Sequence, residues 1–181
     1  MLKRTSNISV LLVLLLAWTM LHASPAAPHV EAALQNARLA GQGKFTWFGL
    51  RIYDAQLWVG EQGYRPGARF ALDLRYARSL QGAKIAAASL DEIKKLGLGS
   101  APQHAAWLQD MTRIFPDVKD GSHITGVFLP DAGARFYLDG KLLGDVADPA
   151  FAQAFFAIWL DPKTSAPGLR DALLLDAAPR R

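Results

Sequence analysis

Residues 40–58 read AGQGKFTWFGLRIYDAQLW, and this stretch predicts the first two strands of the fold. Aromatic and aliphatic residues dominate it, which is typical of strands, and we expect those strands to cover 39–47 and 50–59. One cation, Arg51, lies among these apolar side chains. It either faces water, or it lines a pocket in which a cation and a phenol hold an anion.

The clearest strand signal follows at residues 70–76, where large apolar side chains alternate with smaller or charged ones. A period of two predicts a strand with one buried face. The remaining elements are predicted from the same kinds of pattern: helices over 84–96, 100–114, 150–160 and 165–175, and strands over 123–129, 134–138 and 141–146. This order of elements predicts one α+β domain built on an antiparallel meander.

Three short motifs predict where elements begin and turn. Asp139-Gly140 is a strong signal for a two-residue hairpin turn. Ser100 and Asp148 precede apolar runs with a proline close behind, which predicts the start of a helix at each. Gly41-Gln42-Gly43 has no helix start after it, so we favour a bulge or a tight strand approach over a phosphate-binding loop.

The first 23 residues have the layout of a secretory signal peptide. Lys3 and Arg4 precede an apolar run over 8–21, and small residues follow from Ala23. As a helix this run would span about 20 Å, less than the roughly 30 Å hydrocarbon core of a bilayer, so an uncleaved anchor is the weaker alternative. We therefore predict cleavage near Ala23, a mature domain over 24–181 and a periplasmic location.

The composition excludes several classes of protein. The 181 residues carry a net charge of +4, are 51% apolar and include no cysteine, which suits a globular domain without disulfides or thiolate metal sites. Basic residues are scattered, so no nucleic-acid footprint is expected. The four histidines lack the spacing of metal ligands and no G-x-S-x-G occurs, so we expect no metal and no serine nucleophile.

The candidate site comes from two neighbouring strands. Arg51 and Tyr53 are two residues apart on one strand, which predicts that they share a face. Arg75 and Tyr76 end another strand that is expected to lie beside it. An arginine beside a phenol is a natural clamp for a carboxylate at the mouth of an apolar cavity.

The same residues have a simpler alternative interpretation. Arg51 and Arg75 would then face solvent and pair with Asp54 or Asp73, as strand residues on a wet face do. The tryptophans at 47, 58 and 159 are likewise either core residues or the walls of a pocket, because each buries a large area and needs a partner for its N–H.

Several motifs follow one another along about 39–174. They are GQGKF at 41–45, IYDAQLW at 52–58, LRYARSLQG at 74–82, FPDV at 115–118, GARFY at 133–137 and FAQAFFAIWLDP at 151–162. This combination resembles the bacterial exported branch of the chalcone isomerase-like proteins. The resemblance implies an open-faced β-sandwich, in which a curved antiparallel sheet packs against a layer of helices with a cleft between them.

The resemblance implies one of two activities, and neither needs a cofactor. Plant chalcone isomerases close a chalcone into a flavanone, whereas fatty-acid-binding relatives hold a carboxylate on an arginine and a tyrosine in the same cleft. Carried over residue by residue, the isomerase pattern is incomplete. The isomerases have an arginine just after the G-x-G, where this chain has only Lys44 as a cation. Their strand threonine corresponds to about Tyr53 here, and a second threonine corresponds to about Ile158. The segment 80–85 lacks their catalytic tyrosine.

Missing donors weaken the enzyme hypothesis, because one oxyanion donor is typically worth about 3–4 kcal/mol of barrier. We therefore favour an exported, non-catalytic binding protein for a small apolar acid, such as a fatty acid or related lipid. The alternatives are an intramolecular lyase of the chalcone isomerase type acting through Lys44 and Tyr53, and an envelope scaffold or assembly partner.

The predicted site therefore contains cations, phenols and aromatic walls. The candidates are Lys44, Arg51 and Arg75 as cations, Tyr53 and Tyr76 as phenols, and Trp47, Trp58 and Trp159 as cleft walls. The expected partner is a small apolar or acidic ligand, without metal, cofactor or nucleic acid, and a weak contact with a membrane surface is left open.

Overall fold

The computed structural model describes residues 25–65 and 67–179, and the predicted signal peptide lies outside these ranges. The elements follow in this order: α1 (Pro28–Leu34), β1 (Arg38–Trp47), β2 (Leu50–Val59), β3 (Phe70–Tyr76), α2 (Gly82–Lys95), α3 (Ala101–Ile114), β4 (His123–Leu129), β5 (Gly133–Leu138), β6 (Lys141–Val146), α4 (Pro149–Leu160) and α5 (Pro167–Leu173). Within the described ranges, none of the helices has the length and apolar character needed to span a membrane.

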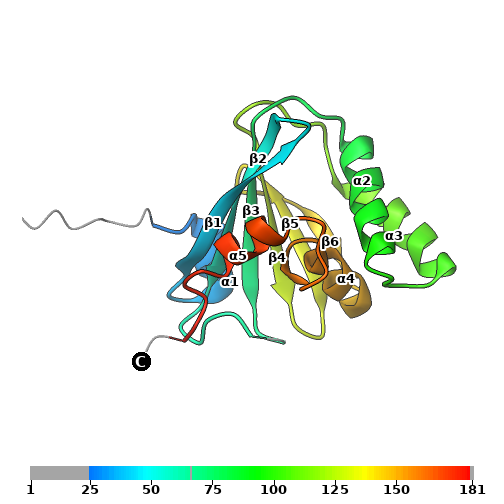
Figure 1. Ribbon diagram of the computed structural model, residues 1–181. Coiled ribbons are helices and arrows are strands. Elements are labelled where there is room, and N and C mark those ends of the chain that lie inside the picture. The colour runs from blue at the N-terminus through cyan, green and yellow to red at the C-terminus, as the bar shows by residue number, and fades with distance from the viewer. Residues whose placement is uncertain (1–24, 66, 180–181) are drawn as a thin grey trace, which may run out of the picture.

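The six strands form one sheet in the order β1 to β6, with every neighbouring pair antiparallel. The sheet is curved, and helices α4 and α5 lie against one side of it, with α2 and α3 packed beside α4 on the same side (Figure 1). The predicted α+β fold with an antiparallel meander is therefore confirmed. The predicted turn at Asp139-Gly140 is also confirmed, since both residues have positive φ between β5 and β6.

The helix starts follow the predicted capping residues. Asp148 accepts hydrogen bonds from the backbone N–H groups of Ala150 and Phe151 at the start of α4. The other carboxylate oxygen of Asp148 accepts a 2.7 Å hydrogen bond from the indole N–H of Trp107, which fastens α3 to α4. Ser100 opens α3 through a capping box with Gln103.

Helix α1 was not predicted, and contacts far along the chain explain why it forms. It has seven residues and no side-chain N-cap, so it is too short to be stable alone. Its buried residues Val30 and Leu34 pack with Trp58, Ala71 and Val127, which project from the side of the sheet opposite to helices α2 to α5.

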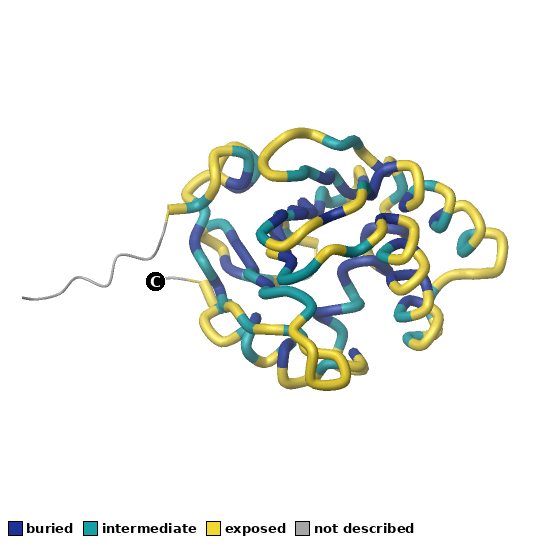
Figure 2. The backbone as a smooth tube through the Cα atoms, turned by 90° about the horizontal axis from the view of Figure 1, so that it is seen from above, coloured by how far each residue is buried: buried dark blue, intermediate teal, exposed yellow. Residues whose placement is uncertain are grey.

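The two sides of the sheet are hereafter the inner face, covered by α2 to α5, and the outer face, on which α1 lies. Buried segments concentrate in the sheet and along the helix sides that face it (Figure 2). The inner core is rich in aromatic side chains in edge-to-face contact, among them Phe136, which meets both Phe115 and Phe155. The principal hydrophobic core therefore lies between the inner face and the helices.

The glycines of Gly41-Gln42-Gly43 permit a close approach between β1 and α5. A Cβ atom on Gly41 would lie 2.1 Å from the backbone oxygen of Ala172, and one on Gly43 would lie 2.7 Å from a side-chain carbon of Leu169. These contacts confirm the predicted tight strand approach.

Candidate functional site

The sheet separates the predicted phenols from the predicted cations. Tyr53 and Tyr76 project from the inner face and belong to the inner core region. Lys44 and Arg75 instead line a depression on the outer face. Successive side chains of a strand point to opposite faces, so neighbouring residues such as Arg75 and Tyr76 are sorted to different sides of the sheet.

The two phenols lie side by side on the inner face. Tyr53 and Tyr76 are paired across β2 and β3, and their ring centroids are 6.0 Å apart. Phe45 stacks on Tyr53 at 5.1 Å, and the indole N–H of Trp159 donates a 3.0 Å hydrogen bond to the Tyr53 hydroxyl oxygen. Strands β1, β2 and β3 and helix α4 together build this phenol pair.

Burial keeps both phenols neutral. Desolvation raises the pKa of Tyr53 and of Tyr76 well above the ordinary value of 10.0. The Tyr53 oxygen accepts from Trp159 and retains its own proton, while the Tyr76 hydroxyl has no hydrogen-bond partner among the described residues. The pair can therefore offer O–H donors to a ligand atom in an apolar setting.

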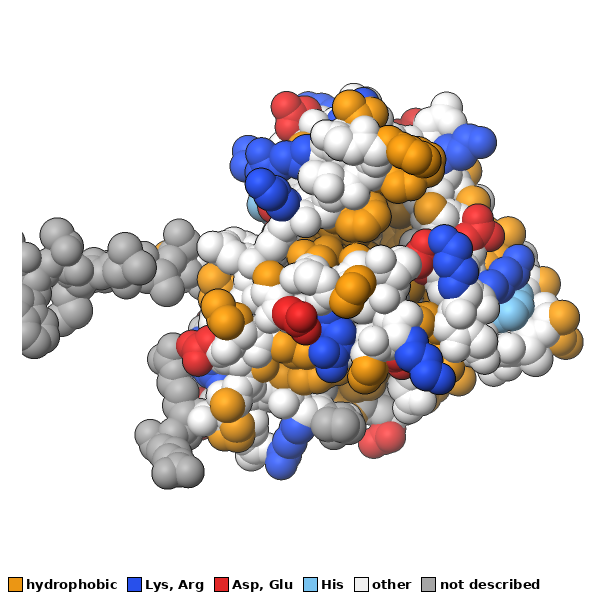
Figure 3. All heavy atoms as spheres, viewed as in Figure 1, with side chains coloured by type: hydrophobic (Ala, Val, Ile, Leu, Met, Phe, Trp, Pro, Cys, Tyr) orange, Lys and Arg blue, Asp and Glu red, His pale blue; other side chains and the backbone are white. Residues whose placement is uncertain are grey.

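The inner site opens beside the β1–β2 hairpin. Phe45, Ile85 and Ile158 are only partly buried where they pack against the inner core. Figure 3 shows a hollow with hydrophobic side chains between the hairpin and the helices. Such a hollow suits an apolar ligand with one polar end.

An acidic group lies near the phenols on the helical side. Glu92 of α2 accepts a 2.6 Å hydrogen bond from the Ser165 hydroxyl and a 2.7 Å bond from the Lys95 ammonium group. The negative charge of Glu92 adds to the rise in the pKa of Tyr53. The side chain of Lys95 is engaged by Glu92 and is largely exposed, so it does not act as a cation beside the phenols.

The outer face carries a shallow polar depression of about 500 Å³. Its lining consists of Gln42, Gly43, Lys44, Asp54, Ala55, Gln56, Asp73, Arg75 and His123. Oppositely charged residues alternate across the strands here, since Lys44 and Arg75 are both register partners of Asp54. This arrangement favours compensation of charges within the protein.

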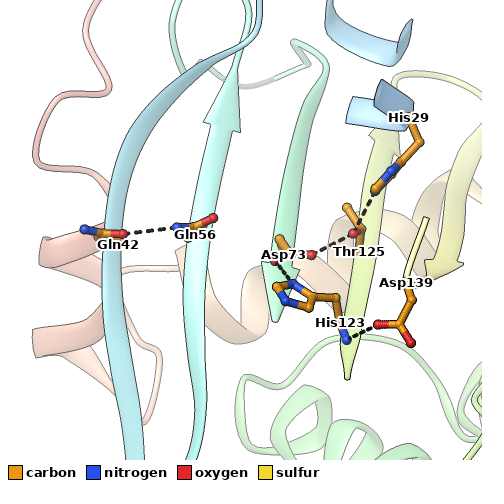
Figure 4. A network of polar contacts seen from close by, with 7 residues as sticks. All are labelled: His29, Gln42, Gln56, Asp73, His123, Thr125 and Asp139. Atoms are coloured by element: carbon orange, nitrogen blue, oxygen red, sulfur yellow. Dashed lines mark hydrogen bonds and ion pairs between the residues drawn. The ribbon is translucent and has the colours of Figure 1, made fainter. Parts of the chain in front are cut away.

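A polar network crosses the outer face from α1 to β4 (Figure 4). One oxygen of Asp73 accepts from the Thr125 hydroxyl at 2.7 Å, and the other lies 2.8 Å from His123 Nδ1. His29 Nε2 lies 3.0 Å from the Thr125 hydroxyl oxygen, and Asp139 accepts from the His123 backbone N–H. The network therefore ties α1 to the sheet.

The network is not arranged for nucleophilic catalysis. The Thr125 hydroxyl is only 1% exposed and donates to the Asp73 carboxylate, so a substrate in solution cannot reach it. The hydrogen bond that the His123 ring donates to Asp73 is the main cause that raises the pKa of His123, whereas burial lowers the pKa of His29. We interpret the network as a structural tether.

The expectation that Arg51 and Tyr53 share a face is wrong. Phe45 pairs with Tyr53 and the next residue, Thr46, pairs with Arg51, so Ile52 is an extra residue that forms a β-bulge. The Arg51 guanidinium forms an exposed ion pair with Asp54, as the alternative interpretation had it. The bulge re-aims Arg51 away from the phenols.

Two of the three tryptophans are not walls of the inner site. Trp47 is 62% exposed at the end of the β1–β2 hairpin, and Trp58 packs against α1 on the outer face. The prediction was wrong for Trp58 because the strand period alone does not say which face the helices cover. It was wrong for Trp47 because this residue lies at the exposed end of the hairpin. Trp159 does lie on the inner side, where it contacts Tyr53.

Few features of the sequence predict the polar network of the outer face. Asp73 and Thr125 sit on predicted strands, and their facing positions would follow from the β3–β4 register. His29 and His123 are 94 positions apart in the chain, and no short motif connects them. Only the docking of α1 onto the sheet brings them to the same network.

Comparison with known proteins adds a family and a fold. A family model described as chalcone isomerase-like matches residues 24–175. Among curated protein sequences, none matches significantly. A crystal structure of an Arabidopsis thaliana fatty-acid binding protein is similar, with a TM-score of 0.65, 14% identity, and coverage of 80% of this chain and 91% of that one. At this identity the similarity shows the shared fold.

Proposed function

Because the chain belongs to the chalcone isomerase-like family, we propose that it is a non-catalytic binding protein for a small apolar acid, such as a fatty acid. The ligand would occupy the cleft between the inner face and the helices. The structural similarity to a plant fatty-acid binding protein supports this class of ligand.

The observation that carries the proposal is the phenol pair in its apolar setting. Tyr53 and Tyr76 lie side by side under hydrophobic side chains, and both remain protonated. Their hydroxyl groups would donate to the polar end of the ligand, while its chain would lie along the apolar hollow.

The structure changes the expected means of binding the acid. The candidate cations Lys44 and Arg75 lie on the outer face, and Arg51 pairs with Asp54. A carboxylate buried without a cation is costly, and desolvation raises the pKa of a carboxylic acid. We therefore propose that neutral phenols bind the head group, and that the acid is bound in its protonated form.

The isomerase alternative receives less support. It requires a cation and a hydroxyl at one reacting centre, and the residues assigned to it were Lys44 and Tyr53. These two residues project from opposite faces of the sheet. A scaffold role remains an outcome of the binding test rather than a second proposal.

Export is a separate proposal that rests on the first 23 residues. Lys3 and Arg4 followed by the apolar run support secretion, and a periplasmic protein would then lack this segment. Mass spectrometry of the protein purified from its native cells would measure the N-terminus. Recovery of the full-length chain would contradict cleavage near Ala23.

Calorimetry with delipidated protein tests the ligand, using palmitic acid and the alcohol of equal chain length, hexadecanol. A phenol pair should bind both with comparable affinity and should bind the acid better as the pH falls. Tyr76→Phe should weaken binding by about twofold to tenfold, since a typical hydrogen bond contributes about 0.5–1.5 kcal/mol.

Arg51→Ala is the matched control, because Arg51 lies two residues from Tyr53 but outside the inner site. It should leave both affinities unchanged. The proposal fails if neither compound binds. Strong preference for the acid, combined with loss of affinity in Arg51→Ala, would instead restore the cation clamp.

A further inference from the structure

The β1–β2 hairpin ends in a cluster of exposed apolar side chains, hereafter the aromatic tip, formed by Trp47, Phe48 and Leu50. Their exposed fractions are 62%, 86% and 52%. Trp47 and Leu50 face each other across the turn, and the ring of Phe48 lies 4.8 Å from that of Trp47. In Figure 1 this end of the hairpin projects from the sheet.

Phe48 is a poor choice for the fold at this position. It has φ of 47° and precedes Gly49 with φ of 75°, which is the two-residue turn that favours Asn-Gly. A bulky side chain in the left-handed region is strained, and this one is exposed as well. Local strain without any gain in core packing points to contact with a partner.

The chemistry of the tip fits a lipid surface. Tryptophan prefers the headgroup level of a bilayer, and phenylalanine and leucine prefer the boundary with the acyl chains. Lys44 and Arg51 flank the tip, against one carboxylate, Asp54, in the described hairpin. The flanking charge is therefore positive and complements anionic lipid headgroups.

We propose that the aromatic tip inserts into the headgroup region of an anionic lipid bilayer. Phe45, two residues before Trp47, stacks on Tyr53, so the tip adjoins the inner site. Docking by the tip would hold the cleft next to the membrane. Membrane docking uses different residues from ligand binding, so either property can fail without the other.

Co-sedimentation with vesicles of phosphatidylcholine and phosphatidylglycerol in equal parts tests the proposal. The protein should bind these vesicles and should bind pure phosphatidylcholine vesicles more weakly. The double variant Trp47→Ser, Phe48→Asn should lose about tenfold or more in its partition coefficient, because two large apolar side chains no longer enter the lipid.

Two controls keep the result specific. Phe48→Asn alone supplies the residue that the turn favours, so it should keep or raise the melting temperature while it weakens vesicle binding. Leu142→Ser removes a similarly exposed side chain, 61% accessible on β6, and should bind vesicles like the parent protein. Both variants should still bind palmitic acid in solution.

Several outcomes would overturn membrane docking. These are no binding of the parent protein to either vesicle, equal binding to both, or an equal loss in Leu142→Ser. Self-association that disappears in Phe48→Asn, without vesicle binding, would assign the tip to a second copy of the chain instead.

Discussion

The inner and outer faces of the sheet use polar residues in opposite ways. On the inner face the polar groups are neutral hydroxyls, Tyr53 and Tyr76, set in an aromatic core. On the outer face they are charged groups that pair with one another, such as Arg51 with Asp54. The comparison teaches that this protein separates neutral hydroxyls in its core from charged groups that pair with one another on the outer face.

Burial explains the division. A cation on the helix-covered face would lose its hydration without gaining an anionic partner, which costs free energy. A neutral phenol has a smaller desolvation cost and still offers a hydrogen-bond donor. Register partners on the outer face bring opposite charges together where water remains accessible. The inner face therefore suits a mostly apolar ligand, and the outer face does not depend on one.

The largest expected loss of stability comes from a substitution that disrupts the packing of the inner face. Phe136 is 1% exposed and contacts the rings of Phe115, Phe151 and Phe155. Phe136→Ala should lower the free energy of unfolding by about 3–5 kcal/mol, because it removes buried surface and leaves a cavity. Urea unfolding measures the change.

The outer-face control for this variant is Leu142→Ala, which truncates an exposed side chain. It should change the free energy of unfolding by no more than about 0.5 kcal/mol. Equal losses in the two variants would contradict the claim that the main core lies on the inner face.

A smaller effect concerns the polar groups of the inner face. Tyr53→Phe leaves the buried N–H of Trp159 without its acceptor, so the free energy of unfolding should fall by about 1–3 kcal/mol. Tyr76→Phe removes a hydroxyl without a protein partner and should stay within about 0.5 kcal/mol. If both variants were equally stable, the Trp159 bond would contribute nothing.

The smallest expected effect is a pH dependence of the free energy of unfolding, caused by the histidines of the outer face. Asp73 and Asp139 raise the pKa of His123, and burial and Arg75 oppose them. Because the pKa of His123 is raised in the folded state, its protonation stabilises the fold fully at a pH below the ordinary pKa of 6.5. This stabilisation is lost as the pH rises through the raised pKa. The His123 side chain is 43% exposed, so the change should be modest.

His29 should show the opposite dependence, because burial lowers its pKa. The contribution of neutral His29 to the free energy of unfolding is present at a pH above 6.5 and is lost as the pH falls through the lowered pKa. Urea unfolding should be measured on both sides of that pH. His123→Asn should lose more free energy of unfolding at the acidic pH, and His29→Gln should lose more at the basic pH. The same slope in both variants would contradict the assigned directions.

Much of the fold followed from local patterns. Alternation over 70–76 predicted a half-buried strand, Asp139-Gly140 predicted the turn, and Ser100 and Asp148 predicted helix starts. Each signal acts within a few residues, through side-chain period, φ preference or capping, so the sequence expresses it directly. The order of motifs also predicted the family, which the match over 24–175 confirms.

The site was less predictable, because its geometry depends on contacts between distant segments. The sequence by itself determined that Tyr53, Tyr76 and Trp159 are present on regular elements. Only the tertiary structure decided that they meet, since α4 has to dock on the sheet for Trp159 to contact Tyr53. Likewise, α1 forms because Val30 and Leu34 find a surface made by other strands.

The faces themselves were settled by packing and by one extra residue. A period of two divides a strand into two sets of side chains, but it does not say which set the helices will cover. The bulge at Ile52 then separates Arg51 from the face of Tyr53. The sequence thus determined the residues and their alternation, and the tertiary structure placed the phenols in the inner core and the candidate cations on the outer side of the sheet.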